Sequence, residues 1–171
     1  MIGDVIGFTL RNVPVLLLIL SFVLALLPRR GAGFSERLLA WVLLLPLGVT
    51  FIWAAVFHLF FPAIAAADIG WQVSPFQFEV GMADLALGVT ACLAVRAAWH
   101  FRLATVCAAS IFLLGDAVGH VRQMLEAGNF APGNAGAPFY VDILAPVLAL
   151  ALLLIVRANA AETRSGLRGS R

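Results

Sequence analysis

The chain has few charged residues and no lysine. Of its 171 residues, 12% are charged and 63% are hydrophobic, and all 11 basic residues are arginine. Average soluble domains carry about 25% charged residues and roughly 45–50% apolar residues. A soluble domain of this composition would expose apolar patches that it could not cover. The composition therefore excludes an ordinary soluble domain and indicates a chain that is solvated by lipid.

Several other features are scarce or missing. The only cysteines are Cys92 and Cys107, which support no disulfide framework. The chain has no phosphate-binding loop, no dinucleotide glycine fingerprint and no Gly-x-Ser-x-Gly elbow. Its C-terminal basic run is short and lacks a partner domain, so we expect no nucleic-acid partner. These absences leave open whether the protein is an enzyme.

Long apolar stretches dominate what remains. Each has roughly 18–24 residues, enough for a helix with a rise of 1.5 Å per residue to cross the ~30 Å hydrocarbon core. Helices also satisfy their own backbone groups, which open strands in lipid cannot do. We predict an all-α, polytopic transmembrane helix bundle with about five helices, over residues 8–27, 38–61, 75–95, 103–124 and 139–156.

The first stretch lacks the marks of a signal peptide. It has no basic region before it, and it ends in Pro28-Arg29-Arg30 rather than in a small-residue cleavage site. We therefore expect it to be retained as a helix. The chain then divides into one transmembrane domain, residues 1–158, and an arginine-rich, flexible cytoplasmic tail, residues 159–171. Pro14, Pro46 and Pro146 lie within apolar stretches and predict kinks.

Alternate connections between the stretches are basic. The first connection, the third connection and the C-terminal tail carry arginines, whereas the connections 62–74 and 125–138 carry none. Because positively charged connections stay in the cytoplasm, this pattern predicts an N-terminus outside and a C-terminus inside. We predict a multi-pass protein of the bacterial inner, or plasma, membrane. The tail is then expected to contact anionic lipid.

Ionisable side chains inside the apolar stretches are the main indication of a site. Five of them fall within roughly 10 Å of the predicted outer boundary, whereas Asp84 falls near the midplane. An isolated carboxylate in lipid costs several kcal/mol, and a shared cavity removes much of that cost. We predict a pocket near the non-cytoplasmic face that binds a cation, protons or a small polar ligand. Its expected lining is His58, Glu79, Asp116 and His120, with Asp142 and Asp84 as second choices.

Other uses of these side chains remain open. The set His58, Glu79, Asp116 and His120 could bind a divalent metal, because histidine and carboxylate ligands suit Zn, Mn or Fe. His58 and His120 could also be axial ligands of a haem. The same side chains could instead form a helix-packing network or a proton relay.

The whole protein also has alternative functions. One is a non-catalytic accessory or scaffold subunit of a larger membrane complex, and another is a membrane-embedded, metal-dependent enzyme. The expected partners are the lipid bilayer and either further copies of the chain or a larger complex. Gly115 and Gly119 form a Gly-x-x-x-Gly pattern, which predicts close helix packing within or between chains. Cys92 and Cys107 are read as small packing residues that could touch.

Three stretches are distinctive as strings of residues: Ile69 to Gly81, Gly115 to His120, and Asn129 to Gly136. On these strings, the chain from about residue 57 to 149 resembles an uncharacterised family of small bacterial multi-helix membrane proteins. That resemblance implies a structural class and no activity. The chain is also loosely similar in architecture to DoxX-type membrane proteins, which suggests a four-helix core with one additional helix.

Overall fold

The protein is an all-helical bundle, as the sequence predicts. The structure is a computed structural model that describes residues 2–28 and 31–169, and no strand occurs among these residues. The helices in chain order are α1 (Ile2–Arg11), α2 (Val13–Leu26), α3 (Phe34–Val42), the π-helix η1 (Leu43–Val49), α4 (Thr50–Phe60), α5 (Pro62–Ile69), α6 (Phe76–Ala94), α7 (Trp99–Ala127), α8 (Pro132–Ala135) and α9 (Ala137–Gly169).

Within the described residues, four helical segments are long and apolar enough to cross a membrane. They are Phe34–Phe60, Phe76–Ala94, Trp99–Ala127 and Pro132–Glu162, and each coincides with one of the last four predicted stretches to within a few residues or encloses it. The first predicted stretch differs, because it is divided at Asn12 and only the 14 residues of α2 continue along the bundle. At 1.5 Å per residue α2 is about 21 Å long, short of the ~30 Å hydrocarbon core.

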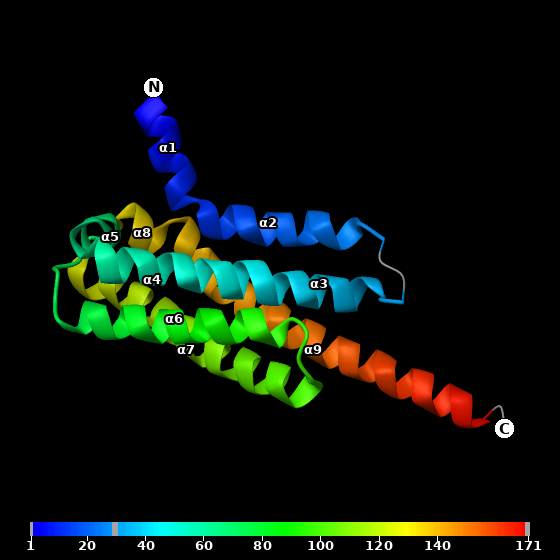
Figure 1. The fold of residues 1–171 in the computed structure, drawn as a ribbon. Helices are drawn as coiled ribbons and strands as arrows, with labels where there is room; N and C mark the ends of the chain where they lie inside the picture. The colour runs from blue at the N-terminus through cyan, green and yellow to red at the C-terminus, as the bar shows by residue number, and fades with distance from the viewer. Residues whose placement is uncertain (1, 29–30, 170–171) are drawn as a thin grey trace.

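Prolines explain two departures from regular helix. Pro14 lies in the first turn of α2, where its missing N–H leaves no bond unmade, and α1 turns away from the bundle just before it (Figure 1). Pro46 lies inside η1, the π-helical part of the Phe34–Phe60 segment. The Thr50 hydroxyl donates a hydrogen bond to the Leu45 carbonyl, 3.3 Å away, and so supports the backbone of this wider turn.

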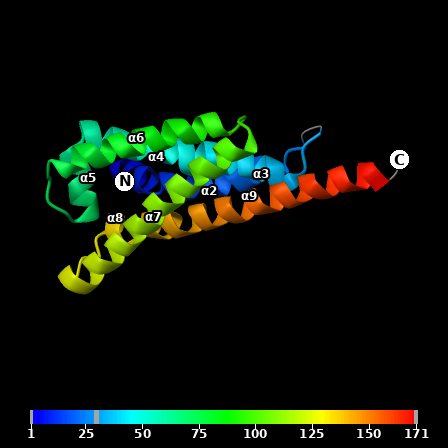
Figure 2. The ribbon, with the colours of Figure 1, turned by 90° about the horizontal axis from the view of Figure 1, so that it is seen from below.

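The continuous rod α3–η1–α4 is the centre of the bundle. It contacts α2, α6 and α9, while α7 packs against α6 and α9. Figures 1 and 2 show α5 and α8 together at one end, here named the α5–α8 end, and the α2–α3 and α6–α7 connections at the other. Arg37, Arg96 and Arg102 lie at this opposite end, so we name it the arginine end.

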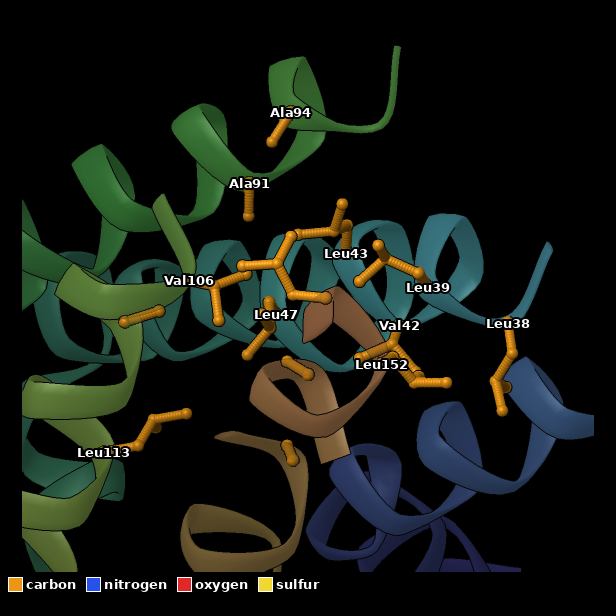
Figure 3. Packing of buried hydrophobic residues seen from close by; sticks show 14 of the residues in the cluster. Leu38, Leu39, Val42, Leu43, Leu47, Ala91, Ala94, Val106, Leu113 and Leu152 are labelled. Atoms are coloured by element: carbon orange, nitrogen blue, oxygen red, sulfur yellow. The ribbon is translucent and has the colours of Figure 1, made fainter. Parts of the chain in front are cut away.

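The apolar core fills the half of the bundle nearest the arginine end. Leu39, Val42, Leu43 and Leu47 project from the central rod and have no exposed surface. They meet small side chains of α6, such as Ala91, and residues of α7 and α9 (Figure 3). In lipid, this close van der Waals packing is what favours helix association, because lipid tails are as apolar as leucine.

Two arginines bind helix C-termini near the arginine end. Arg37 donates to the Ala25 and Ala32 carbonyls, at 2.9 and 2.6 Å, just where α2 ends. Arg102 donates to the Ala94 carbonyl at 3.1 Å and to the carbonyl after it at 2.7 Å, and it pairs with Glu36 at 2.6 Å. A cation at a helix C-terminus satisfies free carbonyls and complements the helix dipole.

Two other arginines, Arg11 and Arg122, lie at the α5–α8 end. Each is paired with a carboxylate: Arg11 Nε lies 2.8 Å from Asp68 Oδ1, and Arg122 Nε lies 3.3 Å from Glu126 Oε1. The unbalanced positive charge of the chain therefore lies toward the arginine end. There, α9 projects past the other helices and continues as far as Gly169, through residues that the sequence analysis assigns to a tail (Figure 2).

Candidate functional site

A cavity of about 480 Å³ lies among the helices at the α5–α8 end. Helix α1, the start of α2, helices α4 to α8 and the start of α9 all contribute to its walls. Its volume falls in the range of about 300–1,000 Å³ that is typical of small-molecule sites. Much of the lining is apolar and aromatic, including Phe51, Trp53, Phe57, Ile64, Trp71 and Leu113.

Three of the four aspartates that line this cavity come from the long helices α6, α7 and α9. They are Asp84 of α6, Asp116 of α7 and Asp142 of α9, and they are near enough for their charges to interact. The Asp84 side chain is buried, with the residue only 3% exposed. Among the described residues, neither Asp84 nor Asp116 accepts a hydrogen bond from the protein or pairs with a cation. Both carboxyl groups are therefore available to the cavity.

Close packing of α6 against α4 places Asp84. A Cβ atom at Gly81 would lie 2.9 Å from Leu59 Cγ, and one at Gly88 would lie 2.9 Å from the Gly48 carbonyl oxygen. Glycine at these two positions therefore lets the two helices approach. Asp84 shares this helix face, so it is directed toward α4 and the cavity rather than toward lipid. The sequence predicts a place for it near the midplane, apart from the others, whereas the structure brings it to the same cavity.

His120 is held in one orientation by a residue of the short helix α8. Its Nδ1 lies 2.8 Å from Asn134 Oδ1, and Asn134 has no exposed surface. The Asn134 amide nitrogen donates to the His120 and Asn129 carbonyls, at 3.2 and 2.9 Å, so its oxygen is the acceptor. His120 Nδ1 must then carry a hydrogen and donate it. His120 Nε2 then faces Asp142 Oδ2, 3.6 Å away. Because a neutral Nε2 and a carboxylate oxygen are both acceptors, a proton or a bridging donor is needed between them.

His58 is fixed in the same way by a different side chain. The Gln77 amide nitrogen lies 2.9 Å from the Pro62 carbonyl and 3.2 Å from His58 Nδ1. Because that nitrogen can only donate, His58 Nδ1 is the acceptor and its hydrogen is on Nε2. The two histidines therefore differ: His58 offers an N–H on Nε2, whereas the Nε2 of a neutral His120 offers a lone pair.

An ion pair and a short helix border the cavity on the side of the N-terminus. Arg11, at the end of α1, pairs with Asp68 of α5, and both side chains are partly exposed and line the cavity. Gly133 of α8 lies against the same aspartate, since a Cβ there would be 2.7 Å from Asp68 Oδ2. The segment that follows α7 and begins at Asn129 therefore packs against α5 beside the cavity.

One residue of the predicted pocket lies outside it. Glu79 is exposed and does not line the cavity. The physical reason is its position on α6, five residues and about 140° around the helix from Asp84. Gln123, which continues the face of Asp116 and His120 along the sequence, does not line the cavity either. Of the six predicted pocket residues, the cavity lining includes His58, Asp84, Asp116, His120 and Asp142 and leaves out Glu79.

The structure does not assemble the predicted metal ligands. Across residues 2–28 and 31–169, no group of three or more His, Cys, Asp or Glu side chains is spaced to hold a metal ion. The exposed position of Glu79 removes one member of the predicted set. The carboxyl groups in the cavity are thus near enough to interact but too dispersed to coordinate a single ion. A divalent metal at this site remains a prediction without a ligand cluster to support it.

The glycine pattern of α7 has a different role from the one that the sequence predicts. Nothing lies within 4 Å of a Cβ built on Gly115 or Gly119, and both residues line the cavity. No helix of the described chain packs against them, so they enlarge the cavity instead. Of the two cysteines, both free, Cys92 packs against Gly48 whereas Cys107 is exposed.

Sequence reasoning missed several residues that shape the site. Asp68 lies in a segment that the sequence predicts to be a connection, and Arg11 lies near the start of the first apolar stretch. Asn134 and Gln77 fix the two histidines, but the sequence does not show which distant side chain a polar amide will contact. The available signal was the distinctiveness of the strings 69–81, 115–120 and 129–136. The contacts of Asn129 with the Ile69 carbonyl at 2.9 Å and of Asn134 with His120 join these three strings.

Comparison with known proteins gives a family and no activity. No curated protein and no solved structure matches the chain significantly. The looser likeness to DoxX-type proteins therefore remains an architectural expectation. The model of a protein family does match, over residues 11–162, and this range includes nearly all of the cavity lining. The chain belongs to this family, DUF6790, which is a family of unknown function.

Proposed function

We propose that this membrane protein binds a small cationic or polar ligand in the cavity at the α5–α8 end and takes it from the non-cytoplasmic side. One observation carries the proposal: Asp84 is almost fully buried, lines a cavity and has no partner in the described chain. A carboxylate in that position costs several kcal/mol unless a ligand, a proton or water compensates it. A binding partner that enters the cavity would remove the cost.

The distribution of arginine supports the orientation. Nine of the 11 arginines belong to the arginine end or the C-terminal tail, and the two at the α5–α8 end are each paired with a carboxylate. The positive-inside rule then places the arginine end in the cytoplasm and the cavity near the outer face. We propose the plasma membrane, which is the inner membrane of a bacterium with two membranes, as the location.

Cysteine accessibility in intact cells tests both parts of this proposal. In a background with Cys92→Ala and Cys107→Ala, we place a cysteine at Gly119, where the structure leaves open space for a side chain. A membrane-impermeant methanethiosulfonate should label Gly119→Cys from outside, because thiols react as thiolates in water. The neighbouring Val118→Cys is the matched control. Val118 lies on the same helix, 61% exposed on the outer surface of the bundle, and should stay unlabelled in lipid.

A cytoplasmic control and a charge test complete the experiment. Ala98→Cys, in the connection between α6 and α7, should react only after the membrane is permeabilised. The trimethylammonium reagent should react at Gly119→Cys about tenfold faster than the sulfonate reagent, because an acidic cleft concentrates cations. Asp84→Asn with Asp116→Asn should remove that preference. Labelling of Ala98→Cys from outside, or equal labelling of Val118→Cys and Gly119→Cys, would overturn the proposal.

A further inference from the structure

We infer that the ligand is an organic cation, an ammonium group on an apolar body, and not a metal ion; this inference rests on the proposed function and specifies its ligand class. The structure combines four features that a metal site would not need together. The cavity has an excess of acidic groups, its carboxyl groups are dispersed, its hydrogen-bonding groups are mainly acceptors, and its walls are aromatic.

The charges of the cavity do not balance within the described chain. Asp68 is matched by Arg11, and Asp142 faces His120. Asp84 and Asp116 face no cation, although both line the cavity. When Asp84 and Asp116 are ionised, the described part of the lining carries negative charge without a matching cation, and a neutral or anionic ligand would not relieve that charge. A cation would do so through charge-assisted hydrogen bonds, which are the stronger class of hydrogen bond.

The spacing of the acidic groups favours a large cation over an ion. A metal needs several ligand atoms converging at about 2 Å, and the described residues offer no such group of three. An ammonium group needs only acceptors within hydrogen-bonding distance, and it carries up to three donors that point in different directions. Carboxyl groups on α6, α7 and α9 that interact without converging suit such a donor-rich group.

The hydrogen-bonding groups of the cavity lead to the same ligand class. Asp84, Asp116 and Asp142 offer oxygen acceptors, and the fixed orientation of His120 presents Nε2 as a further acceptor when the ring is neutral. The donors of the lining are fewer: the His58 Nε2 N–H, the indole N–H groups of Trp53 and Trp71, and Arg11, whose Nε donates to Asp68. Where acceptors outnumber donors, a ligand that donates hydrogen bonds satisfies more buried groups than one that accepts them.

The remaining surface of the cavity fits an apolar body. Trp53, Phe57 and Trp71 line it together with aliphatic residues. Aromatic faces attract organic cations, and more strongly where water is excluded. A hydrated metal ion would gain little from such walls. A volume of about 480 Å³ also far exceeds what a single ion requires.

Binding to the purified full-length protein in a neutral maltoside detergent tests the inference. The probes are phenethylamine, its uncharged counterpart 2-phenylethanol, and the chlorides of Zn²⁺ and Mn²⁺. Calorimetry measures affinity, and tryptophan fluorescence reports on the cavity because two of its wall residues are tryptophans. We expect phenethylamine to bind at least about tenfold more tightly than 2-phenylethanol, the difference that a charged hydrogen bond supplies.

A matched pair of variants on one helix separates the cavity from general charge effects. Asp84→Asn should weaken phenethylamine binding about tenfold or more, because it removes the buried negative charge. Glu79→Gln removes a carboxylate of the same helix that lies outside the cavity and should leave binding unchanged. Thermal unfolding of both variants checks that the fold persists, and Asp116→Asn replaces Asp84→Asn if the latter unfolds.

Each other outcome contradicts the inference in a distinct way. Equal binding of 2-phenylethanol and phenethylamine would show that charge is not recognised. Binding of Zn²⁺ or Mn²⁺ that Asp84→Asn abolishes would assign the site to a metal. Absence of binding by every probe would overturn the organic-cation class. In all three cases, cysteine labelling at Gly119 separately decides whether the water-accessible pocket itself exists, so the two failures are distinguishable.

Discussion

Two glycines on different helices should respond in opposite ways to the same small substitution. Gly88 of α6 faces α4, where an added Cβ would lie 2.8 Å from Ile52 Cγ1 and 2.9 Å from both the Ile52 nitrogen and the Gly48 oxygen. Gly115 of α7 faces open space, with nothing within 4 Å of an added Cβ. Alanine at both positions adds the same methyl group in the middle of a helix, so any difference reports on packing.

The size of the effect follows from these distances. Ordinary contact begins near 3.4 Å, so at Gly88 the two helices must separate by about half an ångström, and two of the three close atoms belong to the backbone and cannot rotate away. Overpacking of this kind costs about 1–3 kcal/mol in the free energy of unfolding. At Gly115, alanine should instead stabilise the protein by roughly 0.5–1 kcal/mol through helix propensity.

Thermal unfolding of the purified variants in one detergent measures the contrast. Each kcal/mol shifts the unfolding temperature by about 2–4 °C in proteins of this size. Gly88→Ala should therefore lower it by several degrees, while Gly115→Ala should leave it unchanged or slightly raised. Equal destabilisation by the two substitutions would refute the assignment of Gly88 to the helix contact and of Gly115 to the cavity.

Three further substitutions test other parts of the fold by the same measurement. Arg102→Gln removes the donor to two carbonyls at the end of α6 and breaks an ion pair, and it should lower the free energy of unfolding by about 1–3 kcal/mol. Arg122→Gln, its control, breaks only an exposed ion pair and should leave that free energy almost unchanged. Asn134→Ala leaves the buried His120 without its acceptor and should cost about 1–3 kcal/mol. Leu43→Ala, in the core, should lower the free energy of unfolding by about 2 kcal/mol, chiefly through lost van der Waals packing, because moving leucine between the core and lipid or detergent changes the free energy little. The exposed Leu93→Ala is its control and should be neutral. A large loss in either control would contradict the assigned contacts.

The sequence predicts the long helices well because their signal is physical and local. A helix that crosses lipid must be continuously apolar, so its length and composition can be read without knowing its neighbours. The same property hides the break at Asn12, since an apolar run looks alike whether it is straight or bent. Pro14 indicates a disturbance there but does not set its size.

The candidate site was only partly predictable, and helix geometry explains where prediction failed. Depth along a helix follows directly from residue number, and His58, Asp116, His120 and Asp142 all line the cavity at the α5–α8 end. Rotation about each helix axis depends on packing partners, which a single sequence does not show. Glu79 therefore entered the predicted pocket on depth alone, although its face of α6 points elsewhere.

Irregular backbone lies beside the cavity at several points of the fold. Backbone that departs from an α-helix is tolerated within a membrane mainly where it is buried in protein or lines a cavity. Here the break at Asn12 lies between Arg11 and Pro14, which line the cavity. The π-helix η1 packs Leu43 and Leu47 into the apolar core and ends next to Thr50 and Phe51, which line the cavity. The short helices α5 and α8 meet beside it at Asp68 and Gly133. The half of the bundle near the arginine end, by contrast, is packed with leucine and alanine. Because a break in a regular helix gives up regular hydrogen bonds, the breaks beside the cavity agree with the proposed binding site, which the cysteine-labelling and ligand-binding experiments test directly.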